Sequence, residues 1–187
     1  MNEKVLKKMG LGKNWIYETI VTTSDEKKDN AAPMGIWTKD FFSIEIEIYK
    51  NSKTFKNILA TNELVVNFVD DPMIFYDSLY ANDRLKYKKA KKVCAPVLRE
   101  ANTWLELKVK GKREWKKTIK ISAEIVSHTL DKRIMLLNRA KYMTLESLIK
   151  ATKVPVKTKE IEENLRVIRK VAPNSEYKKI VEKLLKR

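Results

Sequence analysis

The chain has 187 residues and a mass of 21.9 kDa, which suits one domain or one domain with an appendage. Hydrophobic residues make up 43% and charged residues 34%, so a buried core is expected and intrinsic disorder is excluded. The formal net charge of +16 favours a polyanion or a phosphorylated ligand as partner over a cationic one.

The cysteine content and the length of the apolar runs indicate where in the cell the protein is expected. A single cysteine, Cys94, excludes an intramolecular disulfide. Residues 1–13 lack an apolar core of signal-peptide length, and no apolar run approaches the ~20 residues of a membrane helix. We therefore expect a soluble, cytoplasmic protein without a membrane partner.

Much of the positive charge lies between residues 84 and 120, which hold fourteen Lys and Arg residues and three Glu residues. One interpretation is a surface for an acidic or phosphorylated partner. The other is a solvated Lys-rich surface of the kind found in thermophilic proteins. Lys outnumbers Arg and no aromatic-rich nucleic-acid motif is present, which favours the second interpretation. Nucleic-acid binding is not expected.

The first part of the chain predicts a short basic helix within residues 1–13, followed by strands and one short helix. The strands are expected at 15–23, 31–38, 41–49 and 64–69, and the helix at 54–59. The sequence SDEKKDN, residues 24–30, predicts a turn between the first two strands. The strand at 41–49 alternates most clearly. Its expected apolar face consists of Phe42, Ile44, Ile46 and Ile48.

The second part begins with a less regular segment, residues 70–103, whose length is typical of a functional loop. Strands are expected at 104–110 and 117–126, with GKREWKK as the turn between them. The hydrophobic period then changes to about 3.6 residues. It predicts helices at 134–153 and 158–172 and a third from Ser175, which can cap it. The expected inward side chains of the first helix are Leu137, Ala140, Leu148 and Ile149. Strands followed by helices indicate an α+β fold.

Residues for self-contained catalysis are scarce. The only histidine, His128, excludes a His-based metal site with several His ligands as well as a Ser–His–Asp triad. Neither GxGxxG nor GxxxxGK[ST] occurs, so a Rossmann site and a P-loop are not predicted. We assign no catalytic or metal-ligating residue. The pattern favours a cofactor that carries the chemistry, or a binding protein.

Two neighbouring segments have the character of a ligand site. In residues 30–35, Pro33 cannot donate to a strand ladder and Gly35 has no side chain, so the backbone here faces either a flat ligand or a β-bulge. The second segment combines cations and hydroxyls at the start of the short helix, which suits either a phosphate or an ordinary helix cap. Its residues are Lys50, Ser52, Lys53 and Thr54.

The order of these motifs resembles the FMN-binding split-barrel superfamily, which includes flavin reductase-like and pyridoxamine-phosphate oxidase-like proteins. The motifs are VTT, a turn, NAAPMG, an alternating strand ending in YK, SKTFKNI and LVVNF. Within the superfamily, the chain is most similar to an uncharacterised archaeal family, whose helical part resembles LNRAKYMTLESLIKAT. The resemblance implies an antiparallel split β-barrel over residues 1–130 and a C-terminal helical region over 131–187.

The resemblance also implies FMN at a homodimer interface. The flavin ring would lie against the backbone of Asn30, Ala31, Ala32, Pro33, Met34 and Gly35. The phosphate would be held by Lys50, Ser52, Lys53 and Thr54. The arginine-rich clamp of pyridoxamine-phosphate oxidases is not evident, which favours a flavin reductase-like oxidoreductase that moves electrons between NAD(P)H and an unidentified acceptor. The alternative is a non-catalytic flavin carrier or a polyanion-binding protein.

Overall fold

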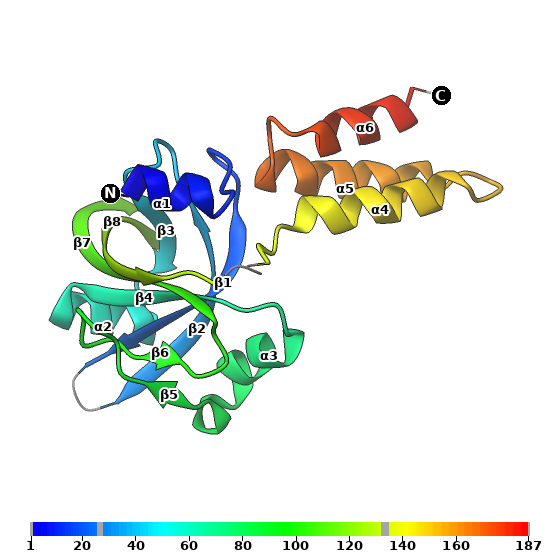
Figure 1. Ribbon diagram of the computed structural model, residues 1–187. Coiled ribbons are helices and arrows are strands. Elements are labelled where there is room, and N and C mark those ends of the chain that lie inside the picture. The colour runs from blue at the N-terminus through cyan, green and yellow to red at the C-terminus, as the bar shows by residue number, and fades with distance from the viewer. Residues whose placement is uncertain (1, 26–27, 132–134, 187) are drawn as a thin grey trace. The chain divides into compact units, whose positions relative to one another are not determined.

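The computed structural model describes residues 2–25, 28–131 and 135–186 (Figure 1). The chain divides into two compact units, one mainly of strands and one of helices. The elements in chain order are α1 (Asn2–Lys8), β1 (Tyr17–Ser24), β2 (Asp29–Trp37), β3 (Ile44–Tyr49), α2 (Lys53–Thr61), β4 (Glu63–Phe68), α3 (Pro72–Tyr80), η1 (Asn82–Arg84), β5 (Tyr87–Lys88), β6 (Val97–Leu98), β7 (Thr103–Trp115), β8 (Thr118–Thr129), α4 (Arg139–Ala151), α5 (Thr158–Val171) and α6 (Glu176–Leu184).

The first unit, Met1–Lys13 with Glu18–Leu137, is built on a closed six-stranded antiparallel barrel. Neighbouring strands follow the order β1-β2-β3-β8-β7-β4, and β4 pairs with β1 to close the barrel. The predicted α+β fold, with an antiparallel barrel first and helices last, is confirmed. Residues 26 and 27 of the predicted SDEKKDN turn lie outside the described residues.

Strand alternation builds the barrel interior. Ile44, Ile46 and Ile48 of β3 are each at most 1% exposed, and they pair with Ala123, Ile121 and Ile119 of β8. These side chains share one face of the sheet because residues two apart in a strand point the same way. Other fully buried large side chains of this unit include Leu6, Ile20, Ile36, Ile58, Leu64, Leu98, Leu105 and Leu107.

The prediction for Phe42 is wrong. Its side chain is 60% exposed, and β3 starts only at Ile44. The carboxylate of Asp40 accepts hydrogen bonds from the backbone N–H groups of Phe42 and Ser43, and Phe41 has a positive φ of 66°. Such a side-chain-to-backbone turn competes with the ladder and ends the strand pattern.

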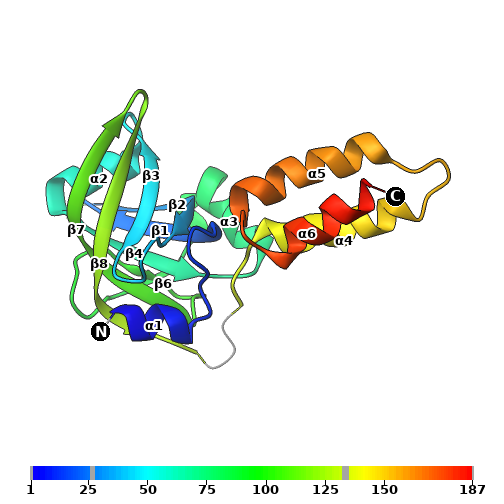
Figure 2. The ribbon, with the colours of Figure 1, turned by 90° about the horizontal axis from the view of Figure 1, so that it is seen from above.

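The turn predicted for GKREWKK is also wrong, because β7 and β8 continue through it as one long hairpin (Figure 2). Only Lys116 and Lys117 remain between the strands, and Lys116 has a positive φ of 31°. The ladder shifts register between Val109 and Gly111. This bulge adds one residue to β7. The two strands then pair again up to Trp115, but the odd-numbered side chains of β7 now face the opposite side of the sheet.

The segment predicted as irregular, residues 70–103, is held against the barrel. Its two-stranded sheet β5–β6 is followed along the chain by β7. Glu106 of β7 is fully buried, and its carboxylate accepts hydrogen bonds from the backbone N–H groups of Lys91 and Lys92 at 2.6–3.1 Å. Val93 and its apolar neighbours pack against Val65 of β4. Residues 89–96, between β5 and β6, therefore form an ordered loop on which Lys91 and Lys92 are exposed.

The second unit, Asn14–Tyr17 with Asn138–Arg187, contains the three C-terminal helices. Ser175 caps α6 by accepting from the N–H of Lys178, as predicted. The predicted start at Ile134 lies outside the described residues, and α4 begins at Arg139. The core of the unit consists of Ala140, Ile161, Leu165, Ile168, Val171, Ala172 and Val181.

The inward face of α4 differs from the prediction. Leu148 and Ile149 are 41% and 44% exposed, whereas Ala140, Thr144 and Ser147 are buried. The two hydroxyls donate to carbonyls of the preceding turn, so these small side chains can be buried without unsatisfied donors. Among the described residues, no helix is long and apolar enough to cross a membrane.

Candidate functional site

The ladder between β2 and β3 is the short side of the candidate site. Their ladder pairs only Ile36 with Ile46 and Trp37 with Glu45, although β2 extends back to Asp29. Pro33 has no N–H and cannot take part in a ladder there. Residues 30–35 therefore have no pairing partner in β3, and residues 32–35 are half-buried. A strand edge of this kind offers hydrogen-bonding groups to another molecule.

A side-chain hydrogen bond joins the two segments that the sequence singled out. The amide of Asn30 donates to Thr54 Oγ1 at 3.1 Å, although the residues are 24 positions apart. Thr54 is 2% exposed, and its hydroxyl proton remains available to a further acceptor. Asn30 on β2 and the first turn of α2 therefore lie side by side.

The backbone of β2 is fixed by residues that the sequence did not indicate. Asn82 accepts from the N–H of Ala31 and donates to its carbonyl, both at 2.9 Å. Tyr87 donates its hydroxyl proton to Asn82 at 3.2 Å, and Thr19 donates to the carbonyl of Met34 at 2.9 Å. Asn82 lies in an irregular stretch, where no sequence period predicts its position. Only the folded chain places it beside β2.

The start of α2 provides hydrogen-bond donors and positive charge. Ser52 is the N-cap: its hydroxyl oxygen accepts from the N–H of Phe55 at 3.1 Å, and its proton is donated to Tyr49 O at 2.7 Å. The Ser52 hydroxyl is thus engaged in capping the helix. The first turn has no acidic residue, so the partial positive charge of the helix N-terminus is not offset by a carboxylate there.

The two lysines of this segment have protein partners. Lys53 Nζ donates to Asp29 O at 3.4 Å, which again connects α2 to β2. Lys50 Nζ lies 2.6 Å from Glu114 Oε2, which stands near the end of β7. The hydrogen bond from Lys50 is the main cause that lowers the pKa of the Glu114 carboxyl below its ordinary value. Glu114 is 77% exposed, so this pair can exchange partners with an incoming anion at little cost.

The arrangement suits a flat molecule with a phosphate group. Ala32 and Gly35 have small side chains and are half-buried, which leaves room for a planar ring beside this part of β2, whereas Ala31 is buried and its N–H and C=O are both bonded to Asn82. A helix N-terminus, the hydroxyl of Thr54 and two lysines lie next to that edge, a combination that suits a phosphate. In the described part of the chain, no group of three or more His, Cys, Asp or Glu side chains is placed to hold a metal ion.

The strand order of the barrel and the short ladder between β2 and β3 are those of a split-barrel fold. The chain belongs to the family described as "Protein of unknown function (DUF447) N-terminal domain", which matches residues 17–132.

Solved structures with the same fold include several flavoproteins. An FMN-bound DUF447 protein from Methanosarcina mazei is 23% identical, with a TM-score of 0.60 over 97% of this chain and 98% of that chain. The NADH:FAD oxidoreductase SgcE6 from Streptomyces globisporus is 14% identical, with a TM-score of 0.55 over 71% and 81%. The flavin reductase HpaC, solved with NADP+, is 16% identical, with a TM-score of 0.53 over 72% and 92%.

Proposed function

We propose that this protein binds FMN, with the ring against the β2 backbone from Asn30 to Gly35 and the phosphate at the start of α2. The observation that carries the proposal is the hydrogen bond from Asn30 to Thr54, which makes the ring edge and the phosphate segment one continuous site. Lys50 and Lys53 would supply the positive charge, and Thr54 a hydroxyl donor. The FMN-bound structure of the Methanosarcina mazei protein supports the choice of ligand.

Ser52 has a narrower role in this proposal. Because its hydroxyl already caps α2, it would hold the helix N-terminus in place, while the first backbone N–H groups of the helix would contact the phosphate. The residues assigned to the FMN site are Asn30, Ala31, Ala32, Pro33, Met34, Gly35, Lys50, Ser52, Lys53 and Thr54.

The activity that we infer is that of a flavin reductase-like oxidoreductase, which takes a hydride from NAD(P)H and passes electrons to an acceptor not yet identified. Bound FMN would supply the redox chemistry, and the protein would position the ring. The absence of a paired catalytic acid and base at β2 is consistent with this division, because the described residues 30–35 have no ionisable side chain. NAD(P)H is favoured as donor by the two nicotinamide-linked proteins of the same fold.

A homodimer belongs to the same proposal. The β2 edge is only half-buried in the single chain, and a second copy could cover the outer face of a bound ring.

The alternative function, binding of an acidic polymer without turnover, is favoured by one observation. Glu106 fixes the backbone of Lys91 and Lys92, and both residues are exposed on an ordered loop.

One experiment separates these functions. Protein reconstituted with FMN should stay yellow after desalting, and the flavin absorbance near 450 nm should bleach when NADH or NADPH is added without oxygen. A yellow protein that does not bleach indicates a flavin carrier. A protein that retains no FMN, yet binds heparin with a steep salt dependence, would establish the polyanion alternative. Sedimentation of the FMN-loaded protein measures the dimer.

A further inference from the structure

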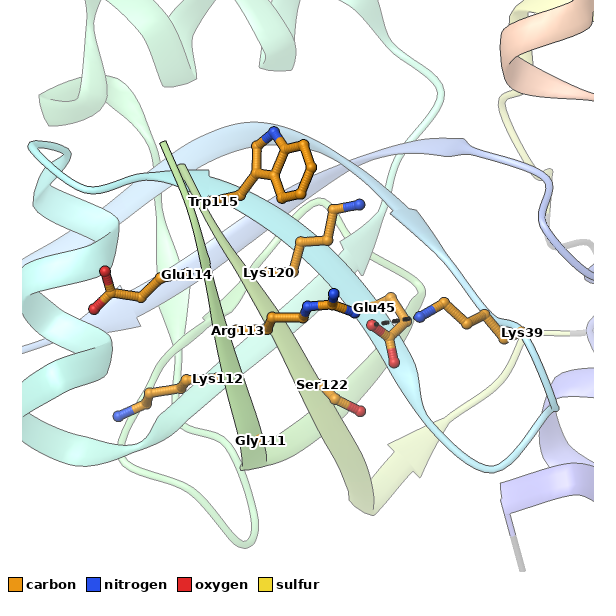
Figure 3. A pocket seen from close by; sticks show the side chains of 9 residues that line it. All are labelled: Lys39, Glu45, Gly111, Lys112, Arg113, Glu114, Trp115, Lys120 and Ser122. Atoms are coloured by element: carbon orange, nitrogen blue, oxygen red, sulfur yellow. Dashed lines mark ion pairs between the residues drawn. The ribbon is translucent and has the colours of Figure 1, made fainter. Parts of the chain in front are cut away.

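A cavity of about 400 Å³ lies on the outer face of β3, β8 and β7, and its volume is typical of small-molecule sites. It shares no residue with the FMN site proposed above. The side chains that matter for its chemistry are Lys39, Glu45, Arg113, Trp115, Lys120 and Ser122 (Figure 3).

The β7 bulge creates this cavity. Before the bulge, Leu107 and Val109 pair with Ile125 and Ala123, on the barrel-facing side. After it, the odd-numbered residues Arg113 and Trp115 pair with Lys120 and Thr118, on the outer side. One extra residue therefore reverses which side chains face outward. Figure 3 shows Arg113 and Trp115 on one side of the hairpin and Lys112 and Glu114 on the other.

Two cations at the centre of the cavity are not neutralised by the protein. Arg113 and Lys120 stand directly opposite each other on β7 and β8, and like charges in that position are unfavourable. In the described part of the chain, neither makes an ion pair within 4.0 Å. Lys120 Nζ instead lies 6.0 Å from the centre of the Trp37 ring, at the outer limit of a cation–π contact.

The nearby acidic groups are already engaged. Glu45 is 8% exposed, and it pairs with Lys39 at 3.6 Å and accepts from the Ser43 hydroxyl at 3.4 Å. Glu47, opposite Lys120 on β3, accepts from the Thr118 hydroxyl at 2.7 Å. An anion placed between Arg113 and Lys120 would relieve their mutual repulsion, and Arg113 could contact two of its oxygens.

An aromatic side chain completes the cavity. Trp115 is 57% exposed near the hairpin tip, on the same side as the two cations. A large, rigid, exposed ring next to an anion site provides a stacking surface for an aromatic group. We propose that this outer cavity binds a phosphorylated aromatic ligand such as a nucleotide, with the phosphate between Arg113 and Lys120 and the ring on Trp115. The site is distinct from the proposed FMN site, although Glu114, which lines the cavity, pairs with Lys50.

Calorimetry with ADP as the probe tests this proposal at low ionic strength on the FMN-loaded protein. ADP should bind. Pyrophosphate and adenosine should each bind more weakly, because pyrophosphate lacks the aromatic ring and adenosine lacks the phosphate groups. Arg113→Gln and Lys120→Gln should each weaken ADP binding about tenfold or more, since each removes a charge-assisted contact. Trp115→Leu should weaken ADP but leave pyrophosphate unchanged.

Lys117→Gln is the matched control, because it removes one charge from the same hairpin without lining the cavity. It should leave ADP affinity unchanged, and circular dichroism reports whether each variant folds. The proposal is overturned if millimolar ADP produces no heat, or if Arg113→Gln and Lys120→Gln bind ADP as the wild type does. It is also overturned if FMN competes with ADP, because the cavity would then belong to the flavin site. Retained FMN absorbance in all variants separates this result from failure of the FMN proposal.

Discussion

At the scale of single residues, Thr54 connects the two halves of the candidate site. Its hydroxyl accepts from Asn30 and can donate to an oxygen of bound phosphate. Thr54→Val keeps the shape of the side chain but removes both interactions. We expect about a tenfold or greater loss of FMN affinity, measured by quenching of flavin fluorescence, because hydrogen bonds to charged groups contribute about 1.5–3 kcal/mol.

Thr61→Val serves as the control for Thr54. Thr61 lies at the other end of the same helix, where its hydroxyl donates to Asn57 O at 3.1 Å. This variant should alter helix stability without changing FMN affinity. Equal FMN binding by Thr54→Val and the wild type would remove Thr54 from the site.

Tyr87 donates a hydrogen bond to Asn82, and its ionisation makes the contribution of this residue to stability depend on pH. Burial, followed by the nearby charges of Asp29 and Glu100, raises the pKa of Tyr87 to about 12 from an ordinary value of 10.0. A raised pKa means that the folded state binds the proton more tightly than the unfolded state. The stability due to this residue is therefore complete below pH 10 and is lost as the pH rises toward 12.

Ultraviolet titration at 295 nm measures this ionisation directly. The difference between wild type and Tyr87→Phe should show one phenol that titrates near pH 12. Unfolding curves of the two proteins should converge between pH 10 and pH 12, where the wild type loses the contribution. A titration midpoint near pH 10 in the difference between the two proteins would show that burial does not raise the pKa of Tyr87.

At the scale of elements, the N-terminus of α2 depends on one cap. Ser52→Ala removes the acceptor for the Phe55 N–H and should lower the free energy of unfolding by about 0.5–2 kcal/mol in urea titrations. Ser52→Asp restores a capping acceptor, so it should restore stability. Its negative charge should nevertheless weaken FMN binding, because it would stand next to the phosphate. Unchanged FMN affinity in Ser52→Asp would place the phosphate elsewhere.

The lysine-rich loop before β6 depends on a buried carboxylate. Glu106→Gln replaces an acceptor of three N–H groups, those of Lys91, Lys92 and the Trp104 ring, by an amide that cannot accept from all of them. We expect a loss of about 1.5–3 kcal/mol in the free energy of unfolding and faster tryptic cleavage of the loop. In contrast, Glu124→Gln removes an exposed pair with Lys110 and should cost less than about 1 kcal/mol.

At the scale of the whole molecule, each compact unit has its own core. The cluster around Ile20 and Leu98 lies within the barrel unit, and the cluster around Ile161 and Ile168 lies within the helical unit. We propose that the barrel folds without the helices. A fragment of residues 1–137 should unfold cooperatively in urea and bind FMN as the full chain does. A fragment without a cooperative transition would show that the barrel requires the helical unit.

The sequence alone determined the order of the barrel strands, α2 and the C-terminal helices, and the class of fold. Alternation over 44–49 and over 118–126 is a local property, because side chains two apart share a strand face whatever the rest of the chain does. The Ser175 cap is local for the same reason. Asn30, Thr54 and the lysines could be selected because the residue types and their order resemble a known superfamily.

Only the tertiary structure decided how these residues act. Asn82 reaches Ala31 across 51 positions, and Glu114 reaches Lys50 across 64, contacts that no local pattern encodes. The bulge near Lys110 reversed the outward side of β7 and assembled the outer cavity, because strand register is set by pairing with β8. The inward face of α4 was likewise set by close packing on its neighbours rather than by its most apolar residues. Local periodicity thus fixes the elements, whereas contacts between distant segments fix the site.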